Sequence, residues 1–275
     1  MPPSAKTVLL KPPPLLPGDK VGVIAPASNV DRQAFNAGCE TLRRMGYTPI
    51  FQENIFDRDL YFAGTTARRA RELEDMFERD DIRAILCARG GYGCNYLLPE
   101  IDPDKVWRHP KIFAGYSDIT SLLTWFCDVA NLVTFHAPMV AKDFAAEGGV
   151  DQASWNAATG GQPMWELASH AEYGLSPMVE GRADGVLYGG CLSILVASLG
   201  TPYEIRTEGK VLFLEDANER PYKIDRLLMQ LRLAGKLKNI RGIVFGEMLE
   251  CAAPEASYTL QEVVKRVGLV AGCVP

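Results

Sequence analysis

Ser117 has the sequence surroundings of a nucleophile. It stands in GYSD (Gly115–Asp118), where an apolar segment ends and a second apolar segment with helical spacing begins at once. A serine at such a strand-to-helix turn presents its hydroxyl at the carboxyl edge of a parallel sheet. The turn is similar to a nucleophile elbow, although the second glycine of the strict GxSxG pattern is missing. The alternative is that Ser117 or Asp118 only caps the helix.

Two backbone N–H groups are candidates to stabilise an oxyanion beside this serine. The N–H of Asp118 lies at the expected helix N-terminus, where the helix dipole favours negative charge. The N–H of Gly91 lies in RGGYG (Arg89–Gly93), whose glycines permit positive φ and close approach of a ligand. GxGxxG and the P-loop lysine are both missing, which argues against a phosphate cradle. The alternative for RGGYG is an ordinary turn between a strand and a helix.

The segment LEDANERPY (Leu214–Tyr222) supplies candidate carboxylates. Glu215 and Asp216 stand at the end of an apolar strand, and a carboxylate in that position can orient a base histidine. The alternative is that Asp216 and Glu219 only favour the N-terminus of the following helix.

The chain has three histidines, His109, His136 and His170. His109 lies in a polar loop and His170 in an irregular spacer. His136 ends an expected strand near the carboxyl edge of the sheet, so it is the internal candidate for a base, and a hydrogen-bonded role lining the site is the favoured interpretation. The seven cysteines form no CxxC pair, which indicates reduced thiols in the cytosol and no zinc site.

The elements that must position these residues alternate between strands and helices. Strands are expected in the apolar run 20–28, which ends in a loop, and at 47–52, 84–88, 111–117 and 132–135. Helices are expected after Asp31, over 66–79 and over 119–129. The second half repeats the alternation, with strands near 185–188, 210–214 and 242–246 and a capping box at Thr259–Glu262. We therefore predict an α/β fold with an N-terminal parallel-sheet domain flanked by helices. The predicted boundaries are an N-terminal domain over 1–145, a linker over 146–177 and a C-terminal domain over 178–275.

Composition narrows the function classes. The chain has 275 residues, 47% of them hydrophobic, a net charge of −5 and a pI near 5.4. This balance argues against nucleic-acid binding, which needs a clustered basic surface. No apolar run approaches the roughly 18 residues that span a bilayer, and the N-terminus lacks the apolar core of a signal peptide. We expect a cytoplasmic protein without a membrane partner.

Taken together, the motifs resemble the LD-carboxypeptidase family of muramoyl-tetrapeptide carboxypeptidases and microcin-immunity-type serine peptidases. The resemblance runs in order through LLPGDKVGVIAPAS, RGGYG, IFAGYSDIT, TFHAPM, YGGCLSILVASLGTP, LFLEDANERPYKIDRLLMQLRLAG and GIVFGEM. It implies a smaller, β-rich α+β C-terminal domain, a homodimer and no cofactor or metal. It also implies a serine-type carboxypeptidase that releases terminal D-alanine from murein tetrapeptide.

The same resemblance implies roles for individual residues. Ser117 matches the nucleophile and Glu215 the acidic triad member, with Gly91 and Asp118 as oxyanion donors and Tyr92 and His136 lining the substrate. Two alternatives remain open: a non-catalytic binder of peptidoglycan peptides, and a hydrolase of a peptidyl-nucleotide toxin.

Two departures from the family pattern bear on activity. Cys191 stands where many relatives have Asn after the paired glycines. The triad histidine of relatives belongs to a Gly-His motif beyond the segment that matches GLVAGCVP, and the printed sequence stops at Pro275. We therefore expect a C-terminally incomplete sequence without its triad histidine, and impaired turnover by the chain as printed.

Overall fold

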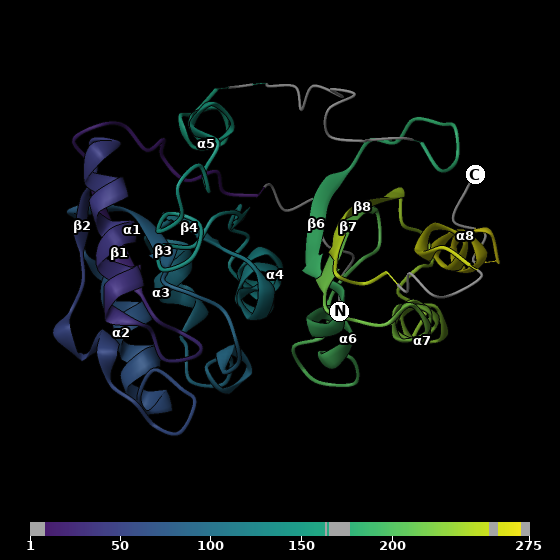
Figure 1. Cartoon of the computed structure of the whole chain (residues 1–275), viewed down its shortest axis with the longest axis horizontal. Helices are drawn as coiled ribbons and strands as arrows, with labels where there is room; N and C mark the ends of the chain where they lie inside the picture. Colours follow the sequence, from purple (N-terminus) through teal and green to yellow (C-terminus); the bar gives the residue numbers. More distant parts are fainter. Residues whose placement is uncertain (1–8, 163, 165–176, 253–257, 271–275) are drawn as a thin grey trace. The chain divides into compact units, whose positions relative to one another are not determined.

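The computed structural model describes residues 9–162, 164, 177–252 and 258–270. The chain divides into two compact units, Met1–Trp165 and Glu166–Pro275, and each is described by itself (Figure 1). His170 and residues 271–275, on which parts of the sequence analysis depend, lie outside the described residues.

The first unit is built on a five-stranded parallel sheet with the strand order β2-β1-β3-β4-β5. Its strands are β1 (Lys20–Ile24), β2 (Thr48–Ile50), β3 (Ile82–Cys87), β4 (Ile112–Gly115) and β5 (Phe135–His136). Its helices are α1 (Arg32–Arg44), α2 (Thr66–Glu78), α3 (Pro103–Arg108), α4 (Thr120–Val129) and α5 (Gln152–Thr159), with 3-10 turns η1 (Glu53–Phe56), η2 (Cys94–Tyr96) and η3 (Ser117–Ile119). The predicted α/β architecture is confirmed.

Both faces of this sheet are covered, because successive side chains of a strand point to opposite sides. On one face Val21 and Val23 of β1 pack with Phe35 of α1 in the main core. On the other face Phe113 of β4 contacts Phe77 of α2, with 6.0 Å between the ring centroids. The alternation explains why the strands read as continuous apolar runs in the sequence.

Two features of the first unit differ from the sequence analysis. The strand expected at 132–135 is shorter and later, because Leu132 instead forms an isolated parallel bridge with Leu10. The stretch 146–177 contains helix α5, whose Trp155 is 4% exposed and packs in the core of the first unit. The buried Trp155 packs this helix into the core. An isolated tryptophan in a Gly- and Ala-rich stretch was therefore a sign of a packed helix, although the prediction for this stretch was a linker.

The second unit contains a three-stranded parallel sheet, β6-β7-β8, within its described residues. The strands are β6 (Val186–Cys191), β7 (Lys210–Ala217) and β8 (Gly242–Leu249), and the helices are α6 (Leu192–Ala197), α7 (Pro221–Leu233) and α8 (Leu260–Val270). Thr259 N–H donates to Glu262 Oε2 at 2.7 Å and Glu262 N–H donates to Thr259 Oγ1 at 3.2 Å, so the predicted capping box is confirmed.

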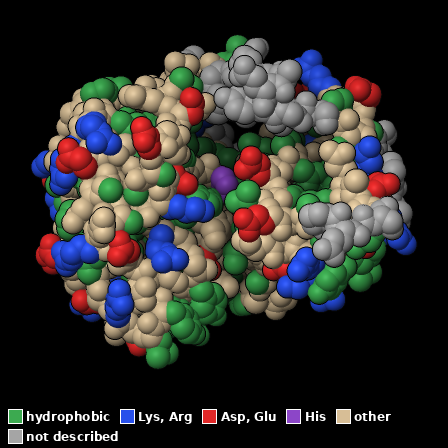
Figure 2. Space-filling model, in the orientation of Figure 1, with side chains coloured by type: hydrophobic (Ala, Val, Ile, Leu, Met, Phe, Trp, Pro, Cys, Tyr) green, Lys and Arg blue, Asp and Glu red, His purple; other side chains and the backbone are tan. Residues whose placement is uncertain are grey.

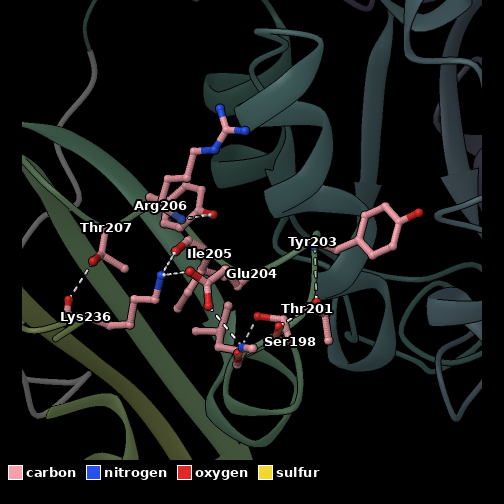
Figure 3. Close-up of polar contacts among 11 residues, drawn as sticks. Ser198, Thr201, Tyr203, Glu204, Ile205, Arg206, Thr207 and Lys236 are labelled. Carbon is pink, nitrogen blue, oxygen red and sulfur yellow. Dashed lines mark hydrogen bonds and ion pairs between the residues drawn. The ribbon is translucent and has the colours of Figure 1, made fainter. Parts of the chain in front are cut away.

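The loop between α6 and β7 is held by Lys236 (Figure 3). The Lys236 ammonium donates to Glu204 Oε1 at 2.8 Å and to the Ile205 carbonyl at 2.9 Å. Thr207 Oγ1 donates in turn to the Lys236 carbonyl at 2.6 Å. The Lys236 side chain is only 15% exposed, so these contacts are screened less by solvent than a surface ion pair is.

The surface of the first unit carries mixed charge. On the face drawn in Figure 2, Lys and Arg side chains alternate with Asp and Glu over this unit. Among the described residues, no helix is long and apolar enough to cross a membrane.

Candidate active site

The Ser117 turn has a strained backbone. Strand β4 ends at Gly115, Tyr116 follows, and Ser117 opens η3 with φ 61, in the left-handed region that non-glycine residues rarely adopt. Such strain persists only where surrounding structure enforces it, and it clusters at functional sites. The turn therefore has the strand–turn–helix geometry that the sequence predicted for a presented hydroxyl.

Neither capping alternative describes this turn. The residues at the N-cap positions of η3 and α4 are Tyr116 and Ile119, and neither makes a side-chain cap hydrogen bond. The Asp118 side chain reaches away from the helix, and its Oδ2 accepts the Cys94 N–H at 2.8 Å. Asp118 therefore ties the serine turn to the end of the RGGYG loop.

Asp118 is fully buried. Burial raises the pKa of its carboxyl above the ordinary range, although the hydrogen bond from Cys94 and the positive charge of Arg69 act in the opposite direction. A change at this residue therefore alters both the serine turn and its electrostatic surroundings.

The RGGYG loop lies against Ser117. A Cβ atom added at Gly90 would lie 3.0 Å from Ser117 Cβ and 3.2 Å from its Oγ, so the glycine makes room for the serine side chain. Gly91 has φ 107, and a Cβ there would lie 2.3 Å from Ser28 Oγ. Both positions require glycine for close approach, which distinguishes this loop from an ordinary turn.

Two amide groups beside the serine remain available as donors. Asp118 is the second residue of η3, in the first turn, where backbone N–H groups have no acceptor within a helix. The Gly91 N–H has no acceptor among the loop hydrogen bonds of the described residues. Ser28 instead engages the neighbours of Gly91: Ser28 N–H donates to the Gly90 carbonyl at 3.3 Å, and Ser28 Oγ accepts the Tyr92 N–H at 3.1 Å. Because Gly90 lies against Ser117 and Asp118 follows it, the N–H groups of Gly91 and Asp118 are the candidates for the pair of donors that an oxyanion needs.

The site lies at the sheet edge where parallel α/β folds bind ligands. The strand order reverses between β1 and β3, and ligands bind outside the carboxyl ends of strands at such a reversal. Ser28 follows β1 and Gly91 follows β3, so these two residues flank the reversal point. This placement is independent of any motif.

Tyr92 and His136 lie near the serine turn in the first unit. Gly115 pairs with His136 between β4 and β5, two residues before Ser117. The His136 side chain is exposed, and its ring lies 5.8 Å from the ring of Tyr116. Tyr92 is 43% exposed and belongs to an aromatic cluster with Tyr61, Phe62 and Tyr96. His109 lies at the end of α3, three residues before β4 begins, at the opposite edge of the sheet.

Glu215 lies in the second unit, on β7. The β7–β8 register shifts between Leu214 and Asp216, so Gly246 and Glu247 together oppose Glu215. Such bulges re-aim side chains and occur next to active sites. The structure therefore brings Ser117, Gly91, Asp118, Tyr92 and His136 together in one unit, while the triad role of Glu215 stays a prediction.

Asp216 has the structural role that the sequence analysis left open. It is 3% exposed, and its Oδ2 accepts Ser193 N–H at 2.8 Å in the first turn of α6. It thus stabilises the start of α6, whereas the sequence analysis placed it at the helix that follows β7. Cys191, which departs from the family pattern, also contacts Asp216: its Sγ lies 3.7 Å from Asp216 Oδ1.

Two buried charged residues of α2 were missed by the sequence analysis. A helix over 66–79 is expected from the sequence without any role for its charged residues, yet Arg69 is fully buried and Glu72 is 2% exposed. Glu72 pairs with Arg68 at 3.1 Å and accepts the Ala25 N–H at 3.1 Å. Burial raises the pKa of Glu72 to about 7, against the lowering effect of Arg68. The available signal was the position of both residues on the apolar stripe of this helix.

The described residues offer no metal site. No group of three or more His, Cys, Asp or Glu side chains among them is arranged to hold a metal ion.

Comparison with known proteins matches both units. Residues 21–137 match the LD-carboxypeptidase N-terminal domain, and residues 184–271 match the LD-carboxypeptidase C-terminal domain. The probable murein peptide carboxypeptidase of Bacillus subtilis is 39% identical over 267 residues, which are 95% of this chain and 83% of that protein.

Solved structures share the fold. The microcin C7 self immunity protein MccF superposes with a TM-score of 0.83 at 23% identity, covering 95% of this chain and 87% of that one. This similarity concerns the fold alone. A muramoyltetrapeptide carboxypeptidase from Oxalobacter formigenes superposes with a TM-score of 0.73 at 25% identity, covering 90% of this chain and 84% of that one.

Proposed function

Because this chain belongs to the LD-carboxypeptidase family and is a serine peptidase of that type, we propose that it releases the terminal D-alanine of murein tetrapeptides. The bond cleaved joins an L-centre to a D-residue. The names of the Bacillus and Oxalobacter relatives support a murein peptide as the substrate. The single observation that carries the proposal is the strained Ser117 turn packed against the glycines of the RGGYG loop.

The proposed mechanism assigns each residue one task. Ser117 Oγ attacks the carbonyl carbon of the scissile bond, and the oxyanion that forms accepts hydrogen bonds from the N–H groups of Gly91 and Asp118. The base that takes the Ser117 proton returns it to the amine of D-alanine as the carbon–nitrogen bond breaks, and water then hydrolyses the acyl-enzyme. Tyr92 and His136 line the substrate, and Glu215 orients the base histidine.

The residue that takes the proton from the Ser117 hydroxyl is assigned from the family pattern alone. A neutral serine hydroxyl is a weak nucleophile without a base to take its proton. None of His109, His136 and His170 stands in the Gly-His motif of relatives. We therefore assign the base to none of these three histidines.

Release of D-alanine from a murein tetrapeptide tests the proposal. The wild-type protein is expected to release one D-alanine per tetrapeptide, and Ser117→Ala is expected to lose at least about 10³-fold in kcat with its fold retained. A folded wild type that binds the tetrapeptide in calorimetry without cleaving it would make the protein a binder. A folded wild type that neither binds nor cleaves would refute the murein assignment.

A second substrate class is distinguished in the same assay. If a peptidyl-nucleotide is hydrolysed with the larger kcat/KM, the protein is a toxin hydrolase of the same family. A homodimer, which the family resemblance implies, and a cytoplasmic location, which the composition and the cysteines indicate, are further predictions. Cell fractionation and light scattering on the purified protein test these two properties.

A further inference from the structure

The loop that carries Gly91 is held from several sides, and Arg69 is the residue that joins it to two neighbouring loops. Arg69 comes from the first turn of α2 and is fully buried. Its Nη1 donates to the Pro26 carbonyl at 2.6 Å and to the Gly93 carbonyl at 2.9 Å, and its Nε donates to the Gly64 carbonyl at 3.3 Å. One guanidinium therefore joins the loop after β1, the loop before α2 and the RGGYG loop.

The surroundings of Arg69 are shaped to its side chain. A Cβ atom at Gly93, where φ is 138, would lie 2.8 Å from Arg69 Nη1 and 2.9 Å from a ring carbon of Phe62. The Phe62 ring also packs against the guanidinium, whose central carbon lies 4.8 Å from the ring centroid. The last glycine of RGGYG is therefore required for the arginine to reach the loop carbonyl.

Burying a guanidinium is costly unless its donors and its charge are compensated. Here the donors meet backbone carbonyls, and Asp118 supplies nearby negative charge. Asp118 directly follows Ser117 and accepts the Cys94 N–H, one residue beyond the Gly93 carbonyl that Arg69 holds. The arginine and the aspartate thus hold the carbonyl and the N–H of one peptide group, the one that joins Gly93 to Cys94 at the end of the RGGYG loop.

Ser28 fixes the other side of the same loop through the Gly90 carbonyl and the Tyr92 N–H. With Gly90, Tyr92, Gly93 and Cys94 all engaged, the Gly91 peptide has little freedom to rotate. Preorganised donors are effective because they need no reorganisation when the oxyanion forms.

We infer that Arg69 is a positioning residue for the oxyanion site, acting through Gly93 and Asp118 to hold the Gly91 N–H beside Ser117. This inference rests on the proposed function of Ser117 and names a residue outside its expected triad. It predicts that loss of Arg69 lowers kcat much more than it changes KM, because the Gly91 donor acts on the oxyanion and not on the bound substrate.

The test compares Arg69→Met and Arg69→Lys with Lys111→Met. Lys111 is a matched control: it is 7% exposed and donates to the Arg79 carbonyl at 2.8 Å, but it precedes β4 at the opposite edge of the sheet. Folding of each variant is checked by circular dichroism and urea unfolding. For Arg69→Met we expect a loss of about 10²-fold in kcat with KM within roughly threefold of wild type. Arg69→Lys is expected to recover part of this loss, and Lys111→Met to retain wild-type kcat.

A second readout separates this inference from the choice of substrate. A fluorophosphonate reacts with an activated serine: the serine oxygen bonds to phosphorus, fluoride leaves, and the serine proton passes to the base. Its rate depends on the oxyanion site and not on peptide recognition. Wild type that reacts with the probe but releases no D-alanine would refute the murein assignment alone, and the labelling rates of the variants would still test Arg69.

Specific results would overturn the inference. Folded Arg69→Met with wild-type kcat and labelling rate would do so, and so would an equal loss in Lys111→Met. If Arg69→Met does not fold, Arg69→Lys serves in its place, because a lysine keeps the charge but lacks the planar fork that reaches the Pro26, Gly64 and Gly93 carbonyls together. It is expected to lose about tenfold in kcat, and unchanged kcat in this variant would refute the clamped loop.

Discussion

Gly91→Ala, compared with a control glycine, tests whether the position of the RGGYG loop affects turnover as well as stability. The added Cβ would lie 2.3 Å from Ser28 Oγ and 2.7 Å from Ser28 Cβ. Ordinary non-bonded contacts need about 3.5 Å, so the loop or Ser28 must move by about 1 Å. A misplacement of that size in an active site costs about 10²-fold in rate. The positive φ of 107 adds strain of about 1–2 kcal/mol, which lowers the free energy of unfolding.

Gly18→Ala is the matched control for this substitution. Gly18 has φ 98, and a Cβ there would meet no atom within 4 Å. The control therefore carries the same kind of backbone strain without the clash and lies away from the Ser117 turn. Both variants are expected to lose about 1–2 kcal/mol in urea unfolding, and only Gly91→Ala is expected to lose kcat for D-alanine release. Equal kcat in the two variants would refute the claim that the Gly91 peptide contributes to turnover.

Three further predictions concern carboxylates and one buried lysine. Glu72→Gln tests the pH dependence of stability: because the folded-state pKa of Glu72 is raised from 4.5 to about 7, wild-type stability falls as pH rises through that window. Between pH 5 and pH 8, urea unfolding is expected to show that the unfolding free energy of wild type falls by up to about 3 kcal/mol relative to that of the glutamine variant. An equal change in the two proteins would contradict the raised pKa of Glu72. Lys236→Met is expected to cost about 1–3 kcal/mol in unfolding free energy through its lost bonds to Glu204 and the loop, whereas Lys238→Met at an exposed site should stay within about 0.5 kcal/mol. Glu215→Gln is expected to lower kcat while calorimetry shows unchanged tetrapeptide binding, and unchanged kinetics would leave Glu215 a structural residue of the β7–β8 bulge.

The sequence predicted the parts of the fold that depend on local pattern. The alternation of strands and helices follows from short apolar runs bounded by glycines and by caps such as Asp31, whose carboxylate accepts the Ala34 N–H at 2.8 Å. The serine turn was predictable for the same reason, because strand, serine and helix are contiguous.

What the sequence did not predict depends on contacts between distant residues. Nothing local to Ser28 indicates that it holds a loop 62 or more residues later. The apolar stripe of α2 indicates a buried position for Arg69, but nothing local indicates that its partners are carbonyls of three loops. Only the strand order places the loops after β1 and β3 beside each other. Helix α5 was missed because Trp155, its buried anchor, is surrounded by small and polar residues with little periodicity.

The hydroxyl of Ser117 is the centre of the account, and mapping the site of fluorophosphonate attachment tests it most directly. Tandem mass spectrometry of the digested, labelled protein is predicted to find a single adduct, on the peptide that contains Ser117, together with complete loss of D-alanine release. An adduct on any other residue that abolishes activity, or full activity after complete labelling of Ser117, would contradict the account.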